Sequence, residues 1–253
     1  MSDSQYSSLR GKRVVVTGGG SGIGAAMTEA FVKQGAFVAF LDIAEQESQA
    51  LAAELASQGP APRYYRCDLT QVAELQKTFA QILQEVGPID ILVNNAANDD
   101  RHQLGEVTEA YWDERMAVNL RHLFFCAQAV TPAMKSAKAG AIINLGSVSW
   151  HVGLPDLALY QTAKAGIEGL TRALARDLGP FGIRVTCVVP GGVRTERQMR
   201  LWHTPEEEAR IVDQQCLKER IEPHHVAAMV LFLASDAGRM CTSHTYFVDA
   251  GWG

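Results

Sequence analysis

A glycine-rich turn near the beginning of the sequence constrains the fold more than any other feature. The turn runs from Thr17 to Gly24, five of its eight residues are glycine, and it directly follows the β-branched run Arg13–Thr17. Glycine lets a backbone turn sharply and come close to a phosphate, and the N-terminus of a following helix offers free N–H groups and a partial positive charge. A glycine-rich turn alone is a weak signal, but a strand before it and a helical pattern after it predict a dinucleotide-binding α/β unit.

Short apolar runs alternate with longer segments of helical spacing along the rest of the chain. In the first helical segment, Ile23, Met27, Ala30 and Phe31 form one apolar face. Continuous apolar strands that alternate with helices are typical of a parallel sheet covered on both faces. We therefore predict a single doubly wound α/β domain of the Rossmann type over residues 1–253. Its expected strands are Arg13–Thr17, Phe37–Leu41, Arg63–Cys67, Ile89–Val93, Ala141–Leu145, Ile183–Val189 and Thr245–Val248.

Composition and charge narrow the class of protein further. The chain has 253 residues, 47% of them hydrophobic and 20% charged, and its net charge is −5. These values are typical of a soluble globular protein, and the acidic balance without a basic patch argues against nucleic acid and membrane surfaces as partners. The start of the chain is polar, and the longest apolar stretch, Val226–Ala234, is too short to cross a bilayer. We therefore expect neither a signal peptide nor a membrane span.

The cysteines and histidines give no sign of disulfide or metal chemistry. The five cysteines are scattered and odd in number, and no Cys-x-x-Cys pair occurs. Reduced, mostly buried thiols in a cytoplasmic protein are the simplest interpretation. The adjacent His224 and His225 have no third ligand at metal-binding spacing, so no metal site is expected.

An acidic residue at the end of the second expected strand indicates which dinucleotide would bind. Asp42 lies 18 residues after Gly24. A carboxylate there can accept hydrogen bonds from both ribose hydroxyls of NAD and would repel the 2′-phosphate of NADP, so we expect NAD as the cofactor. The ends of the third and fourth strands should also contact it. The residues expected to bind the cofactor in this half are Gly18, Ser21, Gly22, Ile23, Gly24, Asp42, Asp68, Leu69, Asn95, Ala96 and Ala97.

The segment from Gly191 to Cys216 differs in character from its surroundings. It carries several charges, the bulky side chain of Trp202 and a short helix that is expected to begin at Thr204. An insertion beyond the carboxyl end of a strand is where a lid over a substrate would lie. We therefore predict a substrate lid at about residues 191–216.

Four polar residues in the middle of the chain suggest catalysis. Tyr160 and Lys164 are four residues apart and so share one face of a helix. Such a pair alone is common by chance and is usually structural. Here, however, Ser147 lies 13 residues earlier, after the fifth strand, and Asn119 lies in a preceding helix.

With these residues in place, the chain resembles the short-chain dehydrogenase/reductase family over essentially its whole length. One small departure is Ala97, where the family usually has glycine, and alanine is also small. The matching residues are Thr17–Gly24, Asp42, Asp68, Asn94–Ala97, Asn119, Ser147, Tyr160, Lys164 and Pro190–Thr195.

The resemblance implies a role for each of the four catalytic residues. Tyr160 is the expected general base for alcohol oxidation, and Ser147 is expected to orient the reacting oxygen. Lys164 would bind the cofactor ribose, and Asn119 would hold a water that links Lys164 to solvent. A free phenol has a pKa of about 10, and lowering it toward 7 requires about 4 kcal/mol, which the lysine ammonium and the positive nicotinamide ring are expected to supply.

The resemblance also implies further cofactor contacts and an assembly. Val193 and Thr195 resemble residues that hold the nicotinamide carboxamide, beside Pro190 and Gly191 at the end of the sixth strand. A homotetramer is expected, in which the helices that carry the catalytic asparagine and tyrosine pack across a subunit interface.

The variable segments resemble those of bacterial NAD-dependent aldose dehydrogenases within this family. Such an enzyme oxidises the anomeric carbon of a cyclic sugar to a lactone, and a pentose such as D-xylose is our first expectation. For His151, a position in the pocket and one on the surface are equally expected. The residues expected to contact the sugar are Asn98, Arg101, Ser147, His151, Tyr160, Gln161 and Trp202.

Three other functions stay open at this point. One is a dehydrogenase for L-fucose, L-arabinose or another sugar or sugar acid. The second is a 3-oxoacyl-thioester reductase, which usually prefers NADP and would need a long apolar channel. The third is a dinucleotide sensor without enzymatic activity, although such proteins tend to lose the tyrosine or the lysine that this chain keeps.

Overall fold

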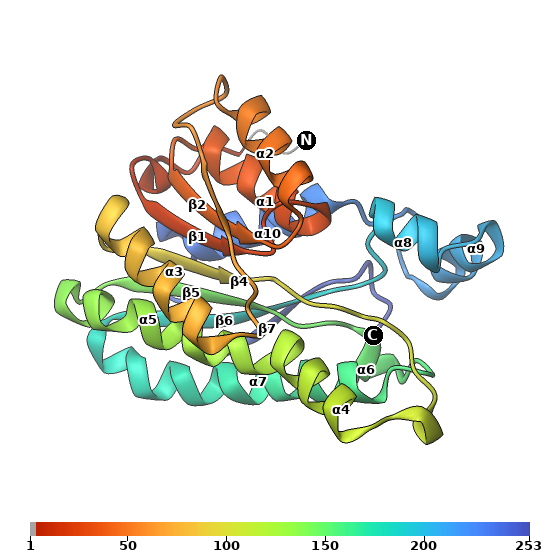
Figure 1. The fold of residues 1–253 in the computed structure, drawn as a ribbon. Helices are drawn as coiled ribbons and strands as arrows, with labels where there is room; N and C mark the ends of the chain where they lie inside the picture. Colours follow the sequence, from red (N-terminus) through yellow and green to blue (C-terminus); the bar gives the residue numbers. More distant parts are fainter. Residues whose placement is uncertain (1–3) are drawn as a thin grey trace.

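The strands lie side by side in one parallel sheet, in the order β3-β2-β1-β4-β5-β6-β7 (Figure 1). The computed structural model describes residues 4–253. Each strand is parallel to its neighbours, so each connection crosses over the sheet, and helices cover both faces. This arrangement confirms the predicted fold class. The strands are β1 (Arg13–Thr17), β2 (Phe37–Asp42), β3 (Arg63–Arg66), β4 (Ile91–Asn94), β5 (Gly140–Leu145), β6 (Ile183–Pro190) and β7 (Thr245–Val248).

The strand ends differ slightly from those expected. β2, β4 and β6 each continue one residue further, to Asp42, Asn94 and Pro190, because backbone pairing with a neighbouring strand continues there. β4 begins at Ile91 rather than at Ile89. Because β2 extends to Asp42, this residue lies within the sheet at the carboxyl end of the strand. Its pairing with Arg66 of β3 defines its position.

Long helices form a layer on each side of the sheet (Figure 1). α1 packs against α10 on one side and α3 against α5 on the other, and the apolar side chains between helix and sheet form two large clusters. Met27 and Phe31 are fully buried, as the helical spacing of the first segment predicts. None of the helices in residues 4–253 is long and apolar enough to cross a membrane. One layer consists of α1 (Gly22–Lys33), α2 (Glu45–Leu55) and α10 (Pro223–Ala234), and the other of α3 (Val72–Glu85), α5 (His122–Ala137) and α7 (Ala158–Leu178).

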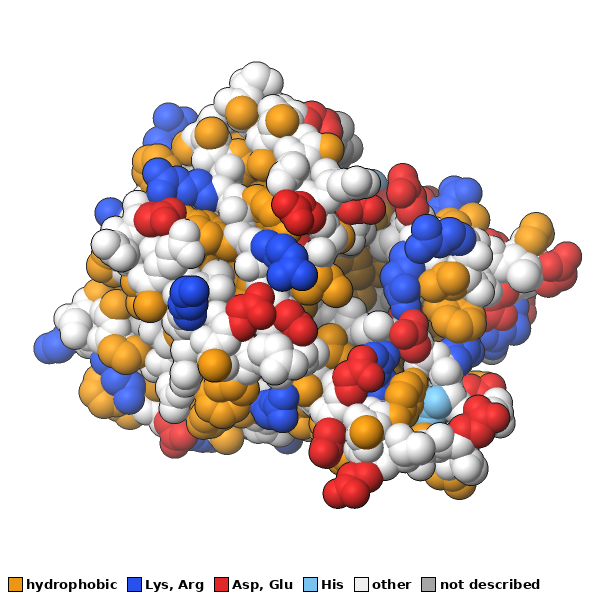
Figure 2. All heavy atoms as spheres, viewed as in Figure 1, with side chains coloured by type: hydrophobic (Ala, Val, Ile, Leu, Met, Phe, Trp, Pro, Cys, Tyr) orange, Lys and Arg blue, Asp and Glu red, His pale blue; other side chains and the backbone are white. Residues whose placement is uncertain are grey.

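Shorter helices gather beyond the carboxyl ends of the strands. α4 (Glu109–Met116) follows β4, and α6 (Ser149–Val152) follows β5. α8 (Glu196–Leu201) and α9 (Pro205–Gln214) follow β6 and stand out from the body of the molecule (Figure 1, at right). Figure 2 shows a hollow between the α8–α9 segment and the rest of the surface. Ligands of open α/β sheets bind at this edge, so the candidate site is sought there.

Candidate active site

The glycine turn between β1 and α1 has a conformation that only glycine accepts easily. Gly18 and Gly22 have φ angles of +61° and +54°, in the left-handed region. A Cβ atom on Gly18 would lie 2.8 Å from Cα of Ala96, and one on Gly24 would lie 1.7 Å from the carbonyl oxygen of Gly18. Ser21 precedes α1 without a side-chain cap on the helix N-terminus. The N-terminus of α1 therefore carries no side-chain cap, which fits the pyrophosphate of a dinucleotide.

Asp42 ties the end of β2 to this turn. One carboxylate oxygen accepts the N–H of Gly20 at 2.9 Å, and the other accepts the N–H of Ala44 at 3.0 Å. Each oxygen has a second lone pair, so the same carboxylate can still accept ribose hydroxyls. A negative charge is therefore fixed beside the glycine turn.

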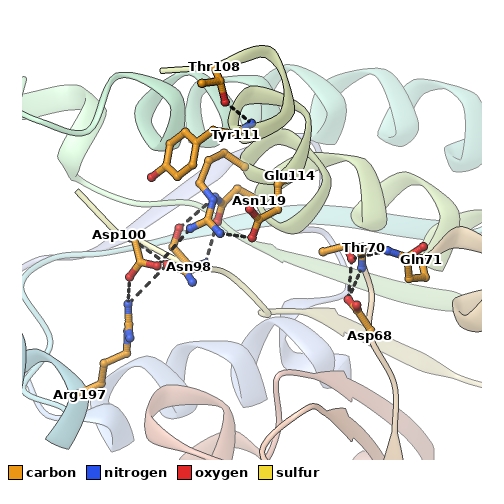
Figure 3. Close-up of polar contacts among 11 residues, drawn as sticks. Asp68, Thr70, Gln71, Asn98, Asp100, Thr108, Tyr111, Glu114, Asn119 and Arg197 are labelled. Atoms are coloured by element: carbon orange, nitrogen blue, oxygen red, sulfur yellow. Dashed lines mark hydrogen bonds and ion pairs between the residues drawn. The ribbon is translucent and has the colours of Figure 1, made fainter. Parts of the chain in front are cut away.

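The other residues expected to bind the adenine side lie at the same edge, partly in structural bonds. Asp68 accepts the N–H and the hydroxyl of Thr70 through one carboxylate oxygen, at 2.9 and 2.7 Å (Figure 3), and Leu69 beside it is buried. Asn95 donates its amide N–H groups to the carbonyls of Thr17 and Gly18 at 3.0 and 2.9 Å. Asn95 therefore stabilises the glycine turn from the neighbouring strand.

The segment after β6 also contacts the glycine turn, through Thr195 beside Gly22. Thr195 accepts the N–H of Gln198 at 3.2 Å and so begins α8. The methyl group of Thr195 lies 3.4 Å from the position that a Cβ of Gly22 would occupy. Val193 is buried and pairs with Ile221 in an isolated bridge. Pro190 and Gly191 complete this strand end, where the N–H of Gly191 donates to Val248.

Ser147, Tyr160 and Lys164 converge at the carboxyl end of β5. Ser147 lies two residues after the strand. Its hydroxyl donates to that of Ser149 at 2.9 Å, and its side chain lies close enough to lower the pKa of Tyr160. Lys164 is 2% exposed, and its Nζ donates to the carbonyl of Leu145 at 2.8 Å and lies 5.4 Å from the ring centre of Tyr160. One turn of α7 thus places a phenol and an ammonium beside a hydroxyl from the segment after β5, an arrangement suited to moving a proton from a substrate hydroxyl.

Burial sets the protonation of this group. It lowers the pKa of Lys164 to about 8, against opposing effects of Cys187 and Asp99. It raises the pKa of Tyr160 well above that of a free phenol, Asp99 raises it further, and the hydrogen bond with Ser147 lowers it. The expectation of a lowered pKa for this tyrosine therefore does not describe the chain alone, because burying a phenolate raises the pKa. Positive charge from a bound oxidised nicotinamide would act in the required direction.

Asn119 lies in a π-helical turn, Ala117–Arg121, between α4 and α5. Its amide oxygen accepts the N–H of Asn98 at 2.8 Å, and its amide nitrogen donates to the carbonyl of Asn98 at 3.0 Å (Figure 3). The side chain thus anchors the loop after β4, and its role in holding a water stays a prediction. Nearby His122 is fully buried, its Nε2 lies 3.1 Å from the carbonyl of Ala96, and burial lowers its pKa to about 4, so the ring is neutral.

A group of charges that the sequence analysis did not assemble joins the loop after β4 to α8. Arg197 contacts Asp99 at 3.3 Å and Asp100 at 2.6 Å, and Gln198 donates to Asp99 at 2.7 Å. From the other side, Arg115 of α4 reaches Asp100 at 3.3 Å (Figure 3). The sequence signal was two adjacent acids and an arginine in the segments expected to bind the substrate, but nothing in the sequence pairs them.

The residues expected to contact the sugar do not all lie together. Arg101 stacks over the ring of Trp202, 4.9 Å from its centre, so this arginine covers one face of the indole that was expected to contact the sugar. Gln161 donates to the carbonyl of Leu154, in the loop before α7. Asn98, by contrast, lies at the centre of the charged group just described.

His151 is the residue that the structure does not bring to the group around Tyr160. Its Nε2 lies 2.9 Å from a carboxylate oxygen of Glu168, which also accepts the indole N–H of Trp150 at 3.0 Å. Its ring packs edge-on against Phe247 of β7, with 4.7 Å between ring centres. Aromatic packing and this carboxylate hold the His151 ring, and its contact with the sugar stays a prediction.

The described part of the chain, residues 4–253, contains no group of three or more His, Cys, Asp or Glu side chains arranged to hold a metal ion. The polar groups at the edge of the sheet instead fit a dinucleotide and an organic substrate.

Comparisons with known proteins place the chain among oxidoreductases. Residues 18–253 match the sequence model of a family described as Enoyl-(Acyl carrier protein) reductase. The chain is 63% identical over 252 residues to D-xylose 1-dehydrogenase of Caulobacter vibrioides, covering 100% of both chains. It is 47% identical over 249 residues to a probable galactose dehydrogenase of Rhizobium meliloti, covering 98% of this chain and 97% of that one.

Solved structures of similar proteins agree in fold along nearly the whole chain. A putative gluconate dehydrogenase from Agrobacterium tumefaciens superposes with a TM-score of 0.93, at 27% identity and 98% coverage of both chains. A blue fluorescent protein from a metagenomic library, solved in complex with NADPH, superposes with a TM-score of 0.88 at 34% identity, over 97% of this chain and 99% of that one.

Proposed function

This chain belongs to the short-chain dehydrogenase/reductase family, and from that premise we propose that it oxidises the anomeric carbon of a cyclic pentose, D-xylose first, with NAD as the cofactor. The product would be the lactone. The observation that carries the choice of substrate is the 63% identity to D-xylose 1-dehydrogenase over the full length of both chains. The charged and amide side chains around Asp99 also suit a substrate with many hydroxyl groups.

The residues around Tyr160 would carry the reaction. Ser147 would donate a hydrogen bond to the anomeric oxygen and hold it in reach of the tyrosine. Tyr160, as the phenolate, would take the proton of that hydroxyl while the hydrogen on the same carbon leaves as hydride. Lys164 would stabilise the phenolate and bind the cofactor ribose. When bound, NAD supplies the hydride acceptor and a positive ring that favours the phenolate.

We propose NAD rather than NADP on the position of Asp42. Its carboxylate is fixed beside the glycine turn by the N–H groups of Gly20 and Ala44. A 2′-phosphate at the adenosine ribose would meet this negative charge at close range, whereas the two hydroxyls of NAD could donate to it. The NADPH in the metagenomic relative belongs to a protein that shares 34% of its residues with this chain.

The α8–α9 segment would act as the substrate lid, within a single domain that spans the chain. It stands beyond the carboxyl ends of the strands (Figure 1). Its contacts with the loop after β4 are made by side chains. Such contacts can break and reform without unfolding the sheet. A sugar could enter and leave through this side.

A homotetramer in the cytoplasm completes the proposal. Phe124 on α5 and Trp112 on α4 are 45% and 44% exposed, which favours burial of this side against a second copy. The cysteines are free thiols in the structure, which suits a reducing compartment. Sedimentation at micromolar concentration tests the assembly, and a stable species of 27.5 kDa would contradict it.

D-Galactose is a second candidate substrate, favoured by the 47% identity to a probable galactose dehydrogenase. A thioester substrate corresponds to the description of the matching family, but the charged loop beside Tyr160 is unsuited to an apolar chain. Neither L-fucose nor L-arabinose is favoured by a separate observation.

Initial rates with NAD test the proposed reaction. The substrates compared should be D-xylose, L-arabinose, D-galactose, L-fucose, an acyl thioester, a hydroxy acid and cyclohexanol. We expect the highest kcat/KM with D-xylose and very low values with cyclohexanol, because a site built for hydroxyls leaves its own polar groups unpaired without them. Rapid turnover of a thioester or hydroxy acid with no free sugar oxidised would contradict the sugar assignment.

A further inference from the structure

Asp99 connects the catalytic tyrosine to the α8–α9 segment. Its negative charge raises the pKa of both Tyr160 and Lys164. Both of its carboxylate oxygens are held from α8, one by Arg197 at 3.3 Å and the other by Gln198 at 2.7 Å. The carboxylate is 23% exposed and the guanidinium side chain 41% exposed, so the pair lies at the mouth of the site.

We propose that Arg197 is a positioning residue for the reaction: from α8 it holds the Asp99 carboxylate and offsets the negative charge that this carboxylate places beside the phenol of Tyr160. Its partner Asp100 shares the same guanidinium at 2.6 Å. This inference rests on the proposed oxidation, because only there must the phenol lose its proton before it can act.

The charged and polar groups around Tyr160 support this role. On its own helix, the Lys164 ammonium lies 5.4 Å from the ring centre of Tyr160. From the segment after β5, Ser147 lowers the pKa of Tyr160. From the loop after β4, Asp99 opposes the phenolate, and His102 approaches the N–H of Leu159 at 3.4 Å. Among the described residues, Arg197 is the cation that contacts Asp99, and Asp99 is the group whose negative charge disfavours the phenolate of Tyr160.

The second acid of the loop has a separate cation from the body of the molecule. Asp100 is held at 3.3 Å by Arg115 of α4, a side chain that is 7% exposed. Within residues 4–253, Asp99 forms no ion pair with the body of the molecule, and its compensating charge comes from α8. Movement of α8 away from the loop would therefore leave Asp99 uncompensated, so closure of α8 and readiness of the base are coupled.

Substitution of Arg197 distinguishes an effect on the ionisation of Tyr160 from a purely structural contact between α8 and the loop after β4. In Arg197→Gln, the acidic limb of kcat/KM for the sugar at saturating NAD should move to higher pH by about one pH unit, because an uncompensated carboxylate disfavours a nearby anion. Asp99→Asn should move the limb to lower pH, and the double variant should return it close to that of the unchanged protein. Arg197→Lys should keep the limb in place because it keeps the charge.

The matched control is Arg200→Gln. Arg200 lies on the same helix and is exposed, so this variant removes the same charge from α8 without touching Asp99. Its pH profile should be unchanged. A change equal to that of Arg197→Gln would overturn the proposal in favour of a general effect of net charge.

A second readout needs no sugar. With tyrosine labelled at ring carbon Cζ and the Tyr160 signal assigned from Tyr160→Phe, NMR titration of the NAD complex should show the Tyr160 phenol ionising at higher pH in Arg197→Gln and at lower pH in Asp99→Asn. These shifts would support the role of Arg197 even if the substrate were not a sugar. A raised KM with an unmoved phenol titration and an unmoved pH limb would overturn it. If Arg197→Gln does not fold, Asp99→Asn alone decides, since an unmoved titration there also overturns it.

Discussion

The cofactor side and the substrate side of the site are held together by different kinds of bonds. On the cofactor side, Asp42 and Asn95 bond to backbone atoms of the glycine turn, and Gly18 and Gly24 leave no room for a side chain. On the substrate side, partly exposed charges of Arg197 and its acidic partners join the loop after β4 to α8. Backbone bonds define a rigid cradle, whereas exposed ion pairs contribute little each and can open. The difference suits a cofactor site of fixed shape beside a substrate site that can open.

The largest effect is expected at Tyr160, where the two sides meet. Tyr160→Phe keeps the ring but removes the proton acceptor, so kcat should fall by about 10³-fold. NAD binding should change by less than about 2-fold, since the cradle is untouched. Steady-state turnover assays measure kcat, and calorimetric titration with NAD measures the affinity. Activity close to that of the unchanged protein would contradict the proposed mechanism.

A side chain in the cradle should damage the cofactor side alone. In Gly24→Ala, the new Cβ would lie 1.7 Å from the carbonyl oxygen of Gly18, so the turn must move. We expect NAD affinity to fall by about 10²-fold. Gly169→Ala is the matched control, because its Cβ would meet nothing within 4 Å. Thermal unfolding of both variants shows whether the fold is intact, and unchanged NAD affinity in Gly24→Ala would contradict a rigid cradle.

Removal of the Asp42 charge should alter the choice of cofactor without altering the substrate side. Asp42→Ala should reduce the preference for NAD over NADP by about 20-fold, because a 2′-phosphate would no longer meet a carboxylate. The ratio of kcat/KM values for the two cofactors measures the change. Equal efficiency with both cofactors in the unchanged protein would show that Asp42 does not decide the preference.

The smallest effect is expected where only a stacking contact closes the substrate side. Arg101→Ala removes the guanidinium over Trp202, and KM for the sugar should rise by about 2- to 5-fold with NAD affinity unchanged. Arg101→Lys keeps a cation over the ring and should lie between the two. A loss of NAD affinity equal to the rise in KM would mean that the two sides are not separate.

Local sequence patterns were enough to predict the sheet and part of the candidate site. The glycine turn and the apolar runs predicted the parallel sheet, and strand ends such as that of β2 differed by one residue. The spacing of Tyr160 and Lys164 predicted a shared helical face, and Ser147, which the sequence analysis already grouped with them, lies beside Tyr160. Such features are readable because each depends on backbone conformation or on residues within one turn of a helix.

The tertiary structure decided the features that depend on distant partners. Arg197 and Asp99 are 98 residues apart, and no periodicity links them. His151 follows Ser147 by four residues, yet Glu168 and Phe247 determine where its ring lies. The pKa of Tyr160 likewise depends on burial, which every element packed around it contributes. A sequence specifies which residues are charged or aromatic, but side-chain contacts and the loss of solvent arise only when separate elements pack together, because both are properties of the assembled surroundings.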